Sequence, residues 1–207
     1  MSKRAEKKYR LYNEIIDAAQ SVFFEKGYQI ATMDDICANA NISKRTLYMY
    51  FTGKDQLIMA VLDRGFDLLV SHYQVIEEKD PLQRLEWIIR NFIQFSFNEP
   101  DYFMLIAQFE NQREDFNQNQ DPLVKSVYQK ANFMINVLLD CVKDGIDQKV
   151  LTQRYDPVNA TIILWSSLFG LCSTLIKKRH YMKFELNRSA EDMIEDTLKM
   201  IRYALIK

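Results

Sequence analysis

Two cations flanked by two hydroxyl groups stand together at Ser43, Lys44, Arg45 and Thr46. Serine is a favoured N-cap, so these residues are predicted to open a helix that has the cations in its first turn. Cations at a helix N-terminus oppose the helix dipole, which is unfavourable for the fold alone. We therefore expect this turn to face a negatively charged partner. The alternative for Lys44 and Arg45 is a solvated helix surface.

A supporting helix is predicted directly upstream of this turn. Thr32 is a suitable N-cap, and Asp34 and Asp35 follow in the first turn, where carboxylates are favourable. Asn41 tolerates the left-handed backbone conformation that ends a helix. Two short helices joined by a tight turn are therefore expected between Thr32 and Lys54.

Five further cations lie near the N-terminus against the single acid Glu6, and they are Lys3, Arg4, Lys7, Lys8 and Arg10. The formal net charge of the whole chain is only −1, so the total charge implies no partner. Such a run is commonly a solvated tail. Beside two short helices it could instead form an arm that contacts phosphates.

Few residues suggest catalysis or metal binding. Cys37, Cys141 and Cys172 are far apart and form no Cys-x-x-Cys motif, which predicts a reducing, cytoplasmic location without disulfides or a zinc site. His72 and His180 have no metal-ligand spacing, and neither a glycine-rich phosphate loop nor a nucleophile motif is present. The charged N-terminus lacks the apolar segment of a signal peptide. We expect no enzyme activity, no cofactor and no metal.

The rest of the chain has the pattern of helices that begin at prolines. All four prolines follow an acid, in Asp80-Pro81, Glu99-Pro100, Asp121-Pro122 and Asp156-Pro157. Proline suits the first helical position, and the acid before it suits the N-cap. Together with the apolar periodicity, this predicts helices at 5–26, 54–77, 81–98, 100–111, 122 to about 145–148, 157–178 and 189–206, and a loop at 111–121. Without strand alternation or repeats, the fold is predicted to be all-α.

The stretch Pro157–Ile176 contains no charged residue and is about as long as a transmembrane helix. It also contains several serine, threonine and asparagine residues, whose transfer into lipid is unfavourable. A helix buried in a protein interface is therefore expected, and a membrane helix is the alternative.

The region 18–57 resembles the DNA-binding domain of the TetR family of bacterial transcriptional regulators. The matching residues are Ala19, Phe23, Gly27, Thr32, Ile36, Ala40, Ile42, Ser43, Thr46, Leu47, Tyr48, Tyr50, Phe51, Lys54 and Leu57. The resemblance covers roughly the first quarter of the chain. It implies an N-terminal three-helix helix-turn-helix domain at 1–56 and a larger helical effector-binding and dimerisation domain at 57–207.

A helix-turn-helix lays its second helix in the major groove of DNA, where the first turn meets the base edges. Lys44 and Arg45 can donate there to guanine, and each good pair discriminates between bases by about 1–3 kcal/mol. By the resemblance, Tyr48 contacts a phosphate, as do Thr32, through its hydroxyl and backbone N–H, and Lys54, through its charge. The alternatives are a plain N-cap for Thr32 and a solvated lysine for Lys54. The predicted DNA-binding residues are Thr32, Ser43, Lys44, Arg45, Thr46, Tyr48, Tyr50 and Lys54.

The end of this reading helix carries four apolar or aromatic residues. Leu47 and Phe51 lie four positions apart and are predicted to pack inward together. Tyr48 and Tyr50 cannot both be core, because they lie two positions apart. This sequence departs from the family pattern at Tyr50, where many members carry histidine, although a phenol can still donate a hydrogen bond.

One reading helix touches too few bases to find an operator, so a homodimer on a near-palindrome of double-stranded DNA is expected. The resemblance implies that the helices at 157–176 and 189–206 form a four-helix bundle with a second copy. The predicted interface residues are Trp165, Leu168, Phe169, Gly170, Leu198 and Ile201. The alternative is that both helices pack only within their own chain.

By the resemblance, the middle helices also enclose a site for a small-molecule effector. The predicted ligand-binding residues are Trp87, Phe92, Phe95, Phe109, Phe133 and Trp165. Gln108 and Glu110 could supply polar anchors, and a largely apolar or aromatic effector is expected. The alternative is that these aromatic residues form an ordinary core.

The sequence thus predicts a TetR-like repressor that an effector releases from its operator through a tilt of the helix beginning at Lys54. The alternatives are activation and control without a ligand. The rival class is a soluble helical scaffolding protein or a membrane-associated protein without specific DNA binding.

Overall fold

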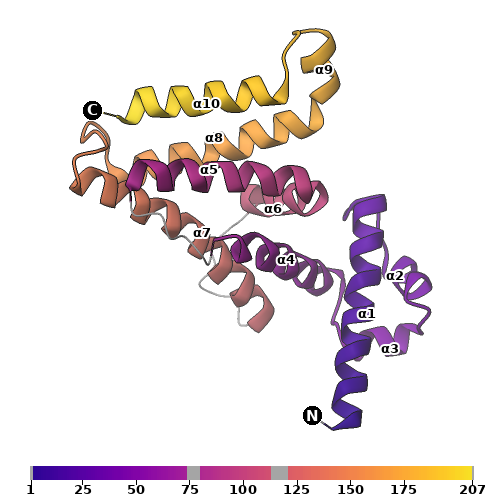
Figure 1. The fold of residues 1–207 in the computed structure, drawn as a ribbon. Helices are drawn as coiled ribbons and strands as arrows, with labels where there is room; N and C mark the ends of the chain where they lie inside the picture. The colour runs from indigo at the N-terminus through magenta and orange to yellow at the C-terminus, as the bar shows by residue number, and fades with distance from the viewer. Residues whose placement is uncertain (1, 74–79, 113–120, 207) are drawn as a thin grey trace. The chain divides into compact units, whose positions relative to one another are not determined.

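The structure, a computed structural model, describes residues 2–73, 80–112 and 121–206. Most of this described chain is helical and it contains no strand, only an isolated antiparallel bridge between Leu151 and Ile206. The helices are α1 (Lys3–Lys26), α2 (Met33–Asn39), α3 (Lys44–Tyr48), α4 (Lys54–Ser71), α5 (Pro81–Asn98), α6 (Pro100–Gln112), α7 (Pro122–Asp147), α8 (Pro157–Lys177), α9 (Arg179–Phe184) and α10 (Ala190–Leu205) (Figure 1). The prediction of an all-α fold is confirmed.

The chain divides into two compact units. The first comprises Met1–Phe66 and Asp115–Tyr128, and the second comprises Asp67–Glu114 and Gln129–Lys207. The first unit therefore holds α1, α2 and α3, while α4 and α7 each begin in the first unit and end in the second. The functional division predicted from the sequence, into 1–56 and 57–207, stays a prediction.

The first unit is built against the inner face of α1, which carries the buried residues Ile15, Ala19 and Val22 at helical spacing. Leu47 and Phe51 are also buried, as their spacing predicted. The Phe51 ring stacks on that of Tyr12, with the centroids 5.1 Å apart, and burial raises the pKa of the Tyr12 phenol. The short helix α3 is thus held by its inward residues rather than by its own length.

Two residues in the left-handed region shape the turns of this unit. Gly27 ends α1 at φ 79°, and its N–H donates to the backbone oxygen of Phe23 at 2.9 Å. Asn41 adopts φ 52° in the turn between α2 and α3. Both positions match the predicted helix ends, because glycine and asparagine adopt this conformation at low energetic cost.

Three of the four acids before the prolines cap a helix with their side chains. Asp80 accepts from the N–H of Gln83 at 2.9 Å, and Asp121 accepts from that of Leu123 at 2.8 Å. Asp156 accepts from two N–H groups in the first turn of α8. These contacts explain why the predicted starts of α5, α7 and α8 are confirmed.

The observed helices differ from the predicted ones in two places. Helix α4 ends at Ser71, and the predicted end at Glu77 lies outside the described residues, as does most of the predicted loop at 111–121. The short helix α9 was not predicted. Its single buried residue, Met182, gives no apolar period to recognise, and Lys178 interrupts the helical backbone before it.

Helix α8 is the described helix whose length and apolar composition would allow it to cross a membrane. The core helix of a soluble protein passes the same test, so this observation is weak evidence. The helix buries Ala160, Leu164, Leu168, Cys172 and Leu175 within the second unit.

Candidate nucleic-acid interface

The first turn of α3 is held by the two hydroxyl groups that flank its cations. The Ser43 hydroxyl accepts from the N–H of Thr46 at 3.1 Å, and the two hydroxyls share a hydrogen bond at 2.9 Å. The predicted N-cap is therefore present. The intervening side chains of Lys44 and Arg45 are both exposed.

The two cations of this turn have different surroundings. The Lys44 ammonium lies 2.7 Å from a carboxylate oxygen of Asp34, and the side chains remain 62% and 65% exposed. This hydrogen bond raises the pKa of Lys44. Arg45 makes no ion pair or hydrogen bond with the residues that the structure describes. Arg45 is therefore free to contact a partner. Lys44 can contact one only by breaking its ion pair with Asp34 or by holding both groups at once.

The outward face of α3 continues through Tyr48 and Met49, which are both exposed. Tyr50 is half-buried. Met49, at the C-cap of α3, was not among the predicted site residues. The helical phase could have identified it, because Leu47 and Phe51 point inward and leave positions 48 and 49 on the opposite side.

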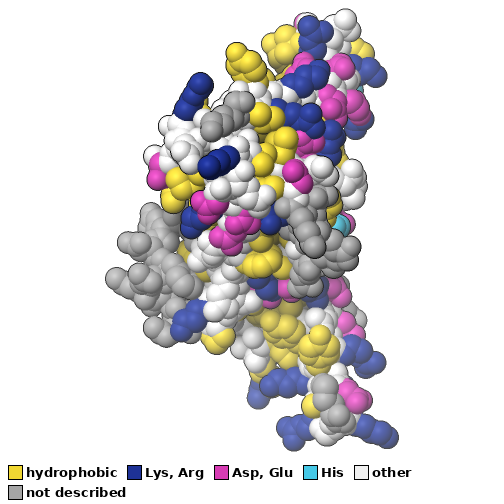
Figure 2. Space-filling view, turned by 60° about the vertical axis from the view of Figure 1, so that its left-hand side comes forward, with side chains coloured by type: hydrophobic (Ala, Val, Ile, Leu, Met, Phe, Trp, Pro, Cys, Tyr) yellow, Lys and Arg dark blue, Asp and Glu magenta, His cyan; other side chains and the backbone are white. Residues whose placement is uncertain are grey.

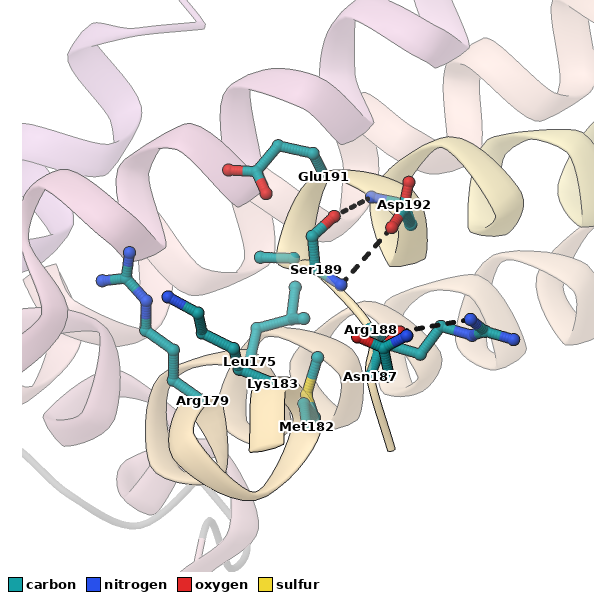
Figure 3. Close-up of a pocket in the computed structure, with 10 residues that line it drawn as sticks. Leu175, Arg179, Met182, Lys183, Asn187, Arg188, Ser189, Glu191 and Asp192 are labelled. Carbon is teal, nitrogen blue, oxygen red and sulfur yellow. Dashed lines mark hydrogen bonds between the residues drawn. The ribbon is translucent and has the colours of Figure 1, made fainter. Parts of the chain in front are cut away.

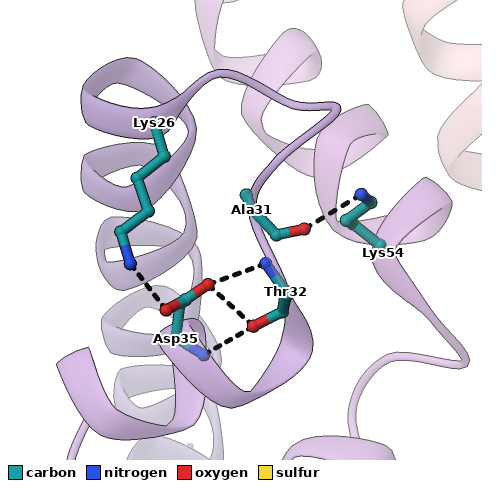
Figure 4. A network of polar contacts seen from close by, with 5 residues as sticks. All are labelled: Lys26, Ala31, Thr32, Asp35 and Lys54. Carbon is teal, nitrogen blue, oxygen red and sulfur yellow. Dashed lines mark hydrogen bonds and ion pairs between the residues drawn. The ribbon is translucent and has the colours of Figure 1, made fainter.

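Thr32 begins α2 through a reciprocal capping box with Asp35 (Figure 4). The Thr32 N–H and hydroxyl donate to one carboxylate oxygen at 3.0 and 2.7 Å, and the Asp35 N–H donates back to the hydroxyl at 3.1 Å. Lys26 donates to the other oxygen at 2.6 Å. The hydrogen bonds from Lys26 and then Thr32 lower the pKa of Asp35 to about 2.

This network uses both groups of Thr32 that were predicted to contact phosphate, the hydroxyl and the backbone N–H. The N-cap role is observed, while the phosphate contact stays a prediction. The network also links α1 to α2, because Lys26 lies in the last turn of α1. Sequence reasoning had missed the role of Lys26.

Lys54 lies against the loop that precedes α2 rather than projecting into solvent. Its ammonium donates to the backbone oxygen of Ala31 at 2.9 Å (Figure 4). It also donates to the backbone oxygens of Tyr28 at 2.8 Å and Gln29 at 3.4 Å. It also lies 4.6 Å from the centre of the Tyr28 ring. An ammonium has three N–H donors, and the three carbonyls can accept all of them. The ammonium of Lys54, which was predicted to contact a phosphate, is therefore already engaged within the chain.

The Tyr28 ring is held in turn by Asp55, whose carboxylate accepts a hydrogen bond from the phenol. Burial, and then this hydrogen bond, raise the pKa of Tyr28 to about 12. Lys54 and Asp55, at the start of α4, therefore both fix the loop between α1 and α2.

The five N-terminal cations lie on the first turns of α1, because the helix already begins at Lys3 with Ser2 as its cap. All five are exposed. In Figure 2, Lys and Arg side chains project at the lower end of the molecule, where Figure 1 places the N-terminus and the start of α1. The predicted arm, if it contacts phosphates, does so as a helix and not as an extended tail.

Four aromatic rings of α5, α6 and α8, which we name the aromatic cluster, meet in the second unit. They are Phe92, Phe103, Trp165 and Phe169. The Phe92 ring lies 5.4 Å from Trp165 and 5.0 Å from Phe169, centroid to centroid. Two of the predicted ligand-binding residues, Phe92 and Trp165, are therefore in contact with each other and leave no space between their rings.

The other predicted ligand-binding residues are dispersed. Trp87 packs edge-on against Tyr73, Phe95 lies near His72, and Phe109 is buried. Phe133 is exposed. A pocket of about 280 Å³ between α6 and α8 lies beside the cluster, and its lining includes Glu110, Trp165, Ser166, Phe169 and Ser173. The predicted anchor Glu110 thus reaches a pocket, whereas Gln108 is exposed.

Three of the predicted dimer residues are buried within their own chain, namely Trp165, Leu168 and Leu198. Phe169 and Ile201 are half-buried, and Gly170 is exposed. A Cβ placed on Gly170 would meet no described atom within 4 Å. Whether any of them meets a second copy stays a prediction.

Helices α8 and α10 expose a different set of apolar side chains, which sequence reasoning missed. Ile163 is 62% exposed, Met200 73% and Tyr203 92%. The helical phase could have identified Ile163 and Met200, because they lie on the side opposite the buried Trp165 and Leu198. An apolar groove of about 510 Å³ runs between the two helices, and its lining includes Ile163 and Met200 as well as Leu168 and Ile201, two of the predicted interface residues.

A third pocket, of about 380 Å³, lies where α9 meets the start of α10 (Figure 3). Arg179 and Lys183 reach from α9 toward the side on which Glu191 lies, and Ser189 caps α10 by accepting from the Asp192 N–H at 3.0 Å. The lining carries charges of both signs, so it favours no single class of ligand.

The described residues include no group of three or more histidine, cysteine or acidic side chains that could hold a metal ion. The three cysteines are free and buried. Burial raises the pKa of all three thiols, in the case of Cys172 to about 11. A buried neutral thiol is a poor nucleophile.

Two short helices with a capped, outward-facing second helix define a helix-turn-helix protein. Residues 15–61 match the family of bacterial regulatory proteins described as the tetR family, and residues 85–197 match the tetracyclin repressor-like C-terminal domain. The chain belongs to the TetR family of transcriptional regulators. Such regulators bind operator DNA and typically act as dimers with small-molecule effectors.

Individual relatives agree with this assignment. The chain is 37% identical over 100 residues to the transcriptional activator FasR of Mycolicibacterium smegmatis, covering 47% of this chain and 45% of FasR. It is 31% identical over 108 residues to IcaR of Staphylococcus aureus, a negative transcriptional regulator of the biofilm operon icaADBC, covering 52% and 58%. The chain thus spans about half the length of each relative.

A solved TetR transcription regulator from Haloarcula marismortui has the same fold, with a TM-score of 0.70 at 20% identity over 96% of this chain and 100% of that one. The relatives named here are regulators of transcription rather than enzymes.

Proposed function

We propose that this protein is a cytoplasmic repressor that binds a near-palindromic operator as a homodimer and leaves it when a small molecule binds. The proposal that the protein reads DNA rests on the outward face of α3. Arg45 lies there exposed in the first turn, while Leu47 and Phe51 anchor the helix from behind. Repression is supported by the similarity to IcaR, a negative regulator.

The proposed contacts follow from the chemistry of this face. Arg45 donates to guanine in the major groove, and the Tyr48 phenol donates to a phosphate. Met49 offers an apolar contact to a thymine methyl group. Ser43 and Thr46 hold the first turn, and Thr32 and Lys54 act chiefly by positioning α2, because their polar groups already have partners in the chain.

The proposed dimer face is the exposed apolar surface of α8 and α10, including Ile163, Met200 and Tyr203. A second copy related by two-fold symmetry would place its own α8 and α10 over the groove, and so complete a four-helix bundle. Covering these side chains supplies the hydrophobic driving force that the isolated chain leaves unused.

The proposed effector site is the aromatic cluster with the adjoining pocket between α6 and α8. In this structure the four rings fill the space among themselves, so a ligand enters by separating them or by extending from the pocket. The aromatic cluster favours a largely apolar or aromatic molecule, and the adjoining pocket adds Glu110, Ser166 and Ser173 as polar anchors. Release follows if the ligand prefers an arrangement in which α4 is tilted and the reading helices leave their half-site spacing.

The test is binding to the DNA that flanks the protein's own gene, measured at several salt concentrations. Affinity should fall steeply as salt rises, because each neutralised phosphate releases counterions. The Arg45→Ala variant should lose the preference for this DNA over random DNA. Tyr181→Ala, which removes an exposed side chain from α9, is the control. If the wild-type protein bound both DNAs equally, the rival class of helical scaffolding or membrane-associated protein would be favoured.

A reporter gene placed behind the bound DNA decides the direction of regulation. Repression predicts that expression rises when the regulator is deleted. FasR is an activator, so the opposite result is a real alternative for a chain with this fold. A fall in expression on deletion would overturn the repressor assignment without affecting the DNA-binding one.

A further inference from the structure

An acid lies on the surface with which the protein is proposed to read DNA. Asp34, in the first turn of α2, contacts the ammonium of Lys44, in the first turn of α3, at 2.7 Å. Both side chains are mostly solvent-exposed, so the pair contributes little to folding. What needs explaining is the position of this ion pair on the surface formed by the first turns of α2 and α3, which we call the reading surface, and not the strength of the pair.

The pair changes the charge that this surface presents to DNA. Lys44 and Asp34 together are neutral, whereas Arg45 beside them is a free cation. A phosphate that approaches Lys44 also meets the Asp34 carboxylate, and like charges repel. If Lys44 breaks its ion pair to bind a phosphate, the Asp34 carboxylate is left without a partner near the DNA backbone.

We propose that Asp34 is a specificity-determining residue, which weakens contacts of Lys44 with random DNA and permits them at the operator. This inference rests on the proposed reading of DNA by α3. At the operator the carboxylate is compensated by an amino group on a base edge, because cytosine N4 and adenine N6 are donors in the major groove. Every base pair carries one such amino group, but its position in the groove depends on the sequence, so on random DNA it often lies out of reach of Asp34 and the repulsion is retained. Specificity arises from a repulsive element as well as from attractive contacts.

The alternative role of Asp34 is to stabilise the N-terminus of α2 through the helix dipole. That role is already served by Asp35, which forms the capping box with Thr32 and accepts from Lys26. Asp34 makes no comparable backbone contact among the described residues, and its carboxylate is directed to α3. The geometry therefore assigns it to the reading surface.

The experiment compares wild-type protein with the Asp34→Asn variant, on the flanking DNA and on random DNA, across several salt concentrations. Asparagine keeps the shape of the side chain and removes its charge. The affinity for random DNA should rise about tenfold, and its salt dependence should steepen by about one phosphate contact, because Lys44 becomes available. The affinity for the operator should rise much less, so the preference for the operator falls by about tenfold.

The Glu195→Gln variant is the matched control. It also removes one negative charge from an exposed ion pair between two helices, that of Glu195 with Arg90 at 2.9 Å, but in the second unit. It should leave both affinities unchanged. A rise in random-DNA affinity equal to that of Asp34→Asn would show a general effect of net charge and would overturn the inference.

The double variant Asp34→Asn/Lys44→Gln tests whether the effect passes through Lys44. The random-DNA affinity should return to near the wild-type value, since the neutral pair is replaced by two neutral side chains. An Asp34→Asn variant with an unchanged operator preference, or a double variant that keeps the raised affinity, overturns the assignment of Asp34. Failure of the proposed function gives a different result, because the wild-type protein then shows no operator preference at all.

Discussion

The ammonium of Lys54 lies 2.9 Å from the backbone oxygen of Ala31 and 4.6 Å from the centre of the Tyr28 ring. A lysine at the start of α4 thus closes the loop that leads into α2. The charge that the family resemblance assigns to a phosphate contact is used here to position the helix that supports the reading helix.

Replacing Lys54 by alanine should therefore reduce stability as well as DNA binding. The hydrogen bonds from the Lys54 ammonium to partly buried carbonyl groups stabilise the fold. Leaving those carbonyls without a donor lowers the free energy of unfolding by about 1–3 kcal/mol. Urea unfolding followed by circular dichroism measures this loss. An unchanged unfolding curve together with weaker DNA binding would instead favour a direct phosphate contact.

The capping box of α2 predicts a stability that depends on acidic pH. The pKa of Asp35 falls from 3.8 to about 2 in the folded chain, chiefly through the hydrogen bond from Lys26. The ionised carboxylate therefore stabilises the fold above about pH 4, and this contribution is lost as the pH falls from 3.8 toward 2. Thermal melts at several pH values should show this decline in the wild-type protein.

The Asp35→Asn variant is the comparison for this pH dependence. Its melting temperature should be lower than that of the wild type at neutral pH and should change less between pH 4 and 2. Parallel curves for the two proteins would show that Asp35 does not contribute to the acid dependence. Asp34→Asn serves as the control, because Asp34 takes no part in the capping box.

The core position Leu47 couples the reading helix to the rest of its unit. It is fully buried, so Leu47→Ala leaves a cavity and should destabilise the unit by about 2–5 kcal/mol. Because α3 has only five residues, it depends on this packing and the variant should lose operator binding. Urea unfolding and DNA binding measure the two effects. A variant that kept wild-type stability would contradict the packing role.

The proposed dimer face predicts that a charge on α10 separates the subunits. Met200→Glu and Tyr203→Glu should each give a monomer in sedimentation experiments, since the carboxylate would be buried against an apolar surface. Tyr181→Glu, on an exposed aromatic residue of α9, should leave the dimer intact. Dimers that persist in both α10 variants would place the interface elsewhere.

The aromatic cluster predicts a response of Trp165 to the effector. If the ligand separates the rings, the fluorescence of Trp165 should change on binding in a Trp87→Phe background, where it is the remaining tryptophan. Phe92→Ala, which removes the ring that touches both Trp165 and Phe169, should cost about 3–5 kcal/mol in stability. A released operator with unchanged fluorescence would place the effector site away from the cluster.

Local signals account for what the sequence determined by itself. Gly27 and Asn41 marked the ends of α1 and α2, since each position requires a backbone conformation that few residues adopt easily. Asp80, Asp121 and Asp156 marked helix starts because a side chain can reach the N–H groups two or three residues ahead. The inward pair Leu47 and Phe51 followed from the helical period.

Tertiary structure alone decided which polar and aromatic groups are already engaged. Lys44 has Asp34 as its partner, and Lys54 has the carbonyls of a loop more than twenty residues earlier. Phe92 and Trp165 meet across two helices that are far apart in the sequence. Local pattern shows that a residue can donate or pack, but the folded chain determines which partner lies within reach. For this protein it distinguishes Arg45, whose cation is free, from the neighbouring Lys44, whose cation is shared.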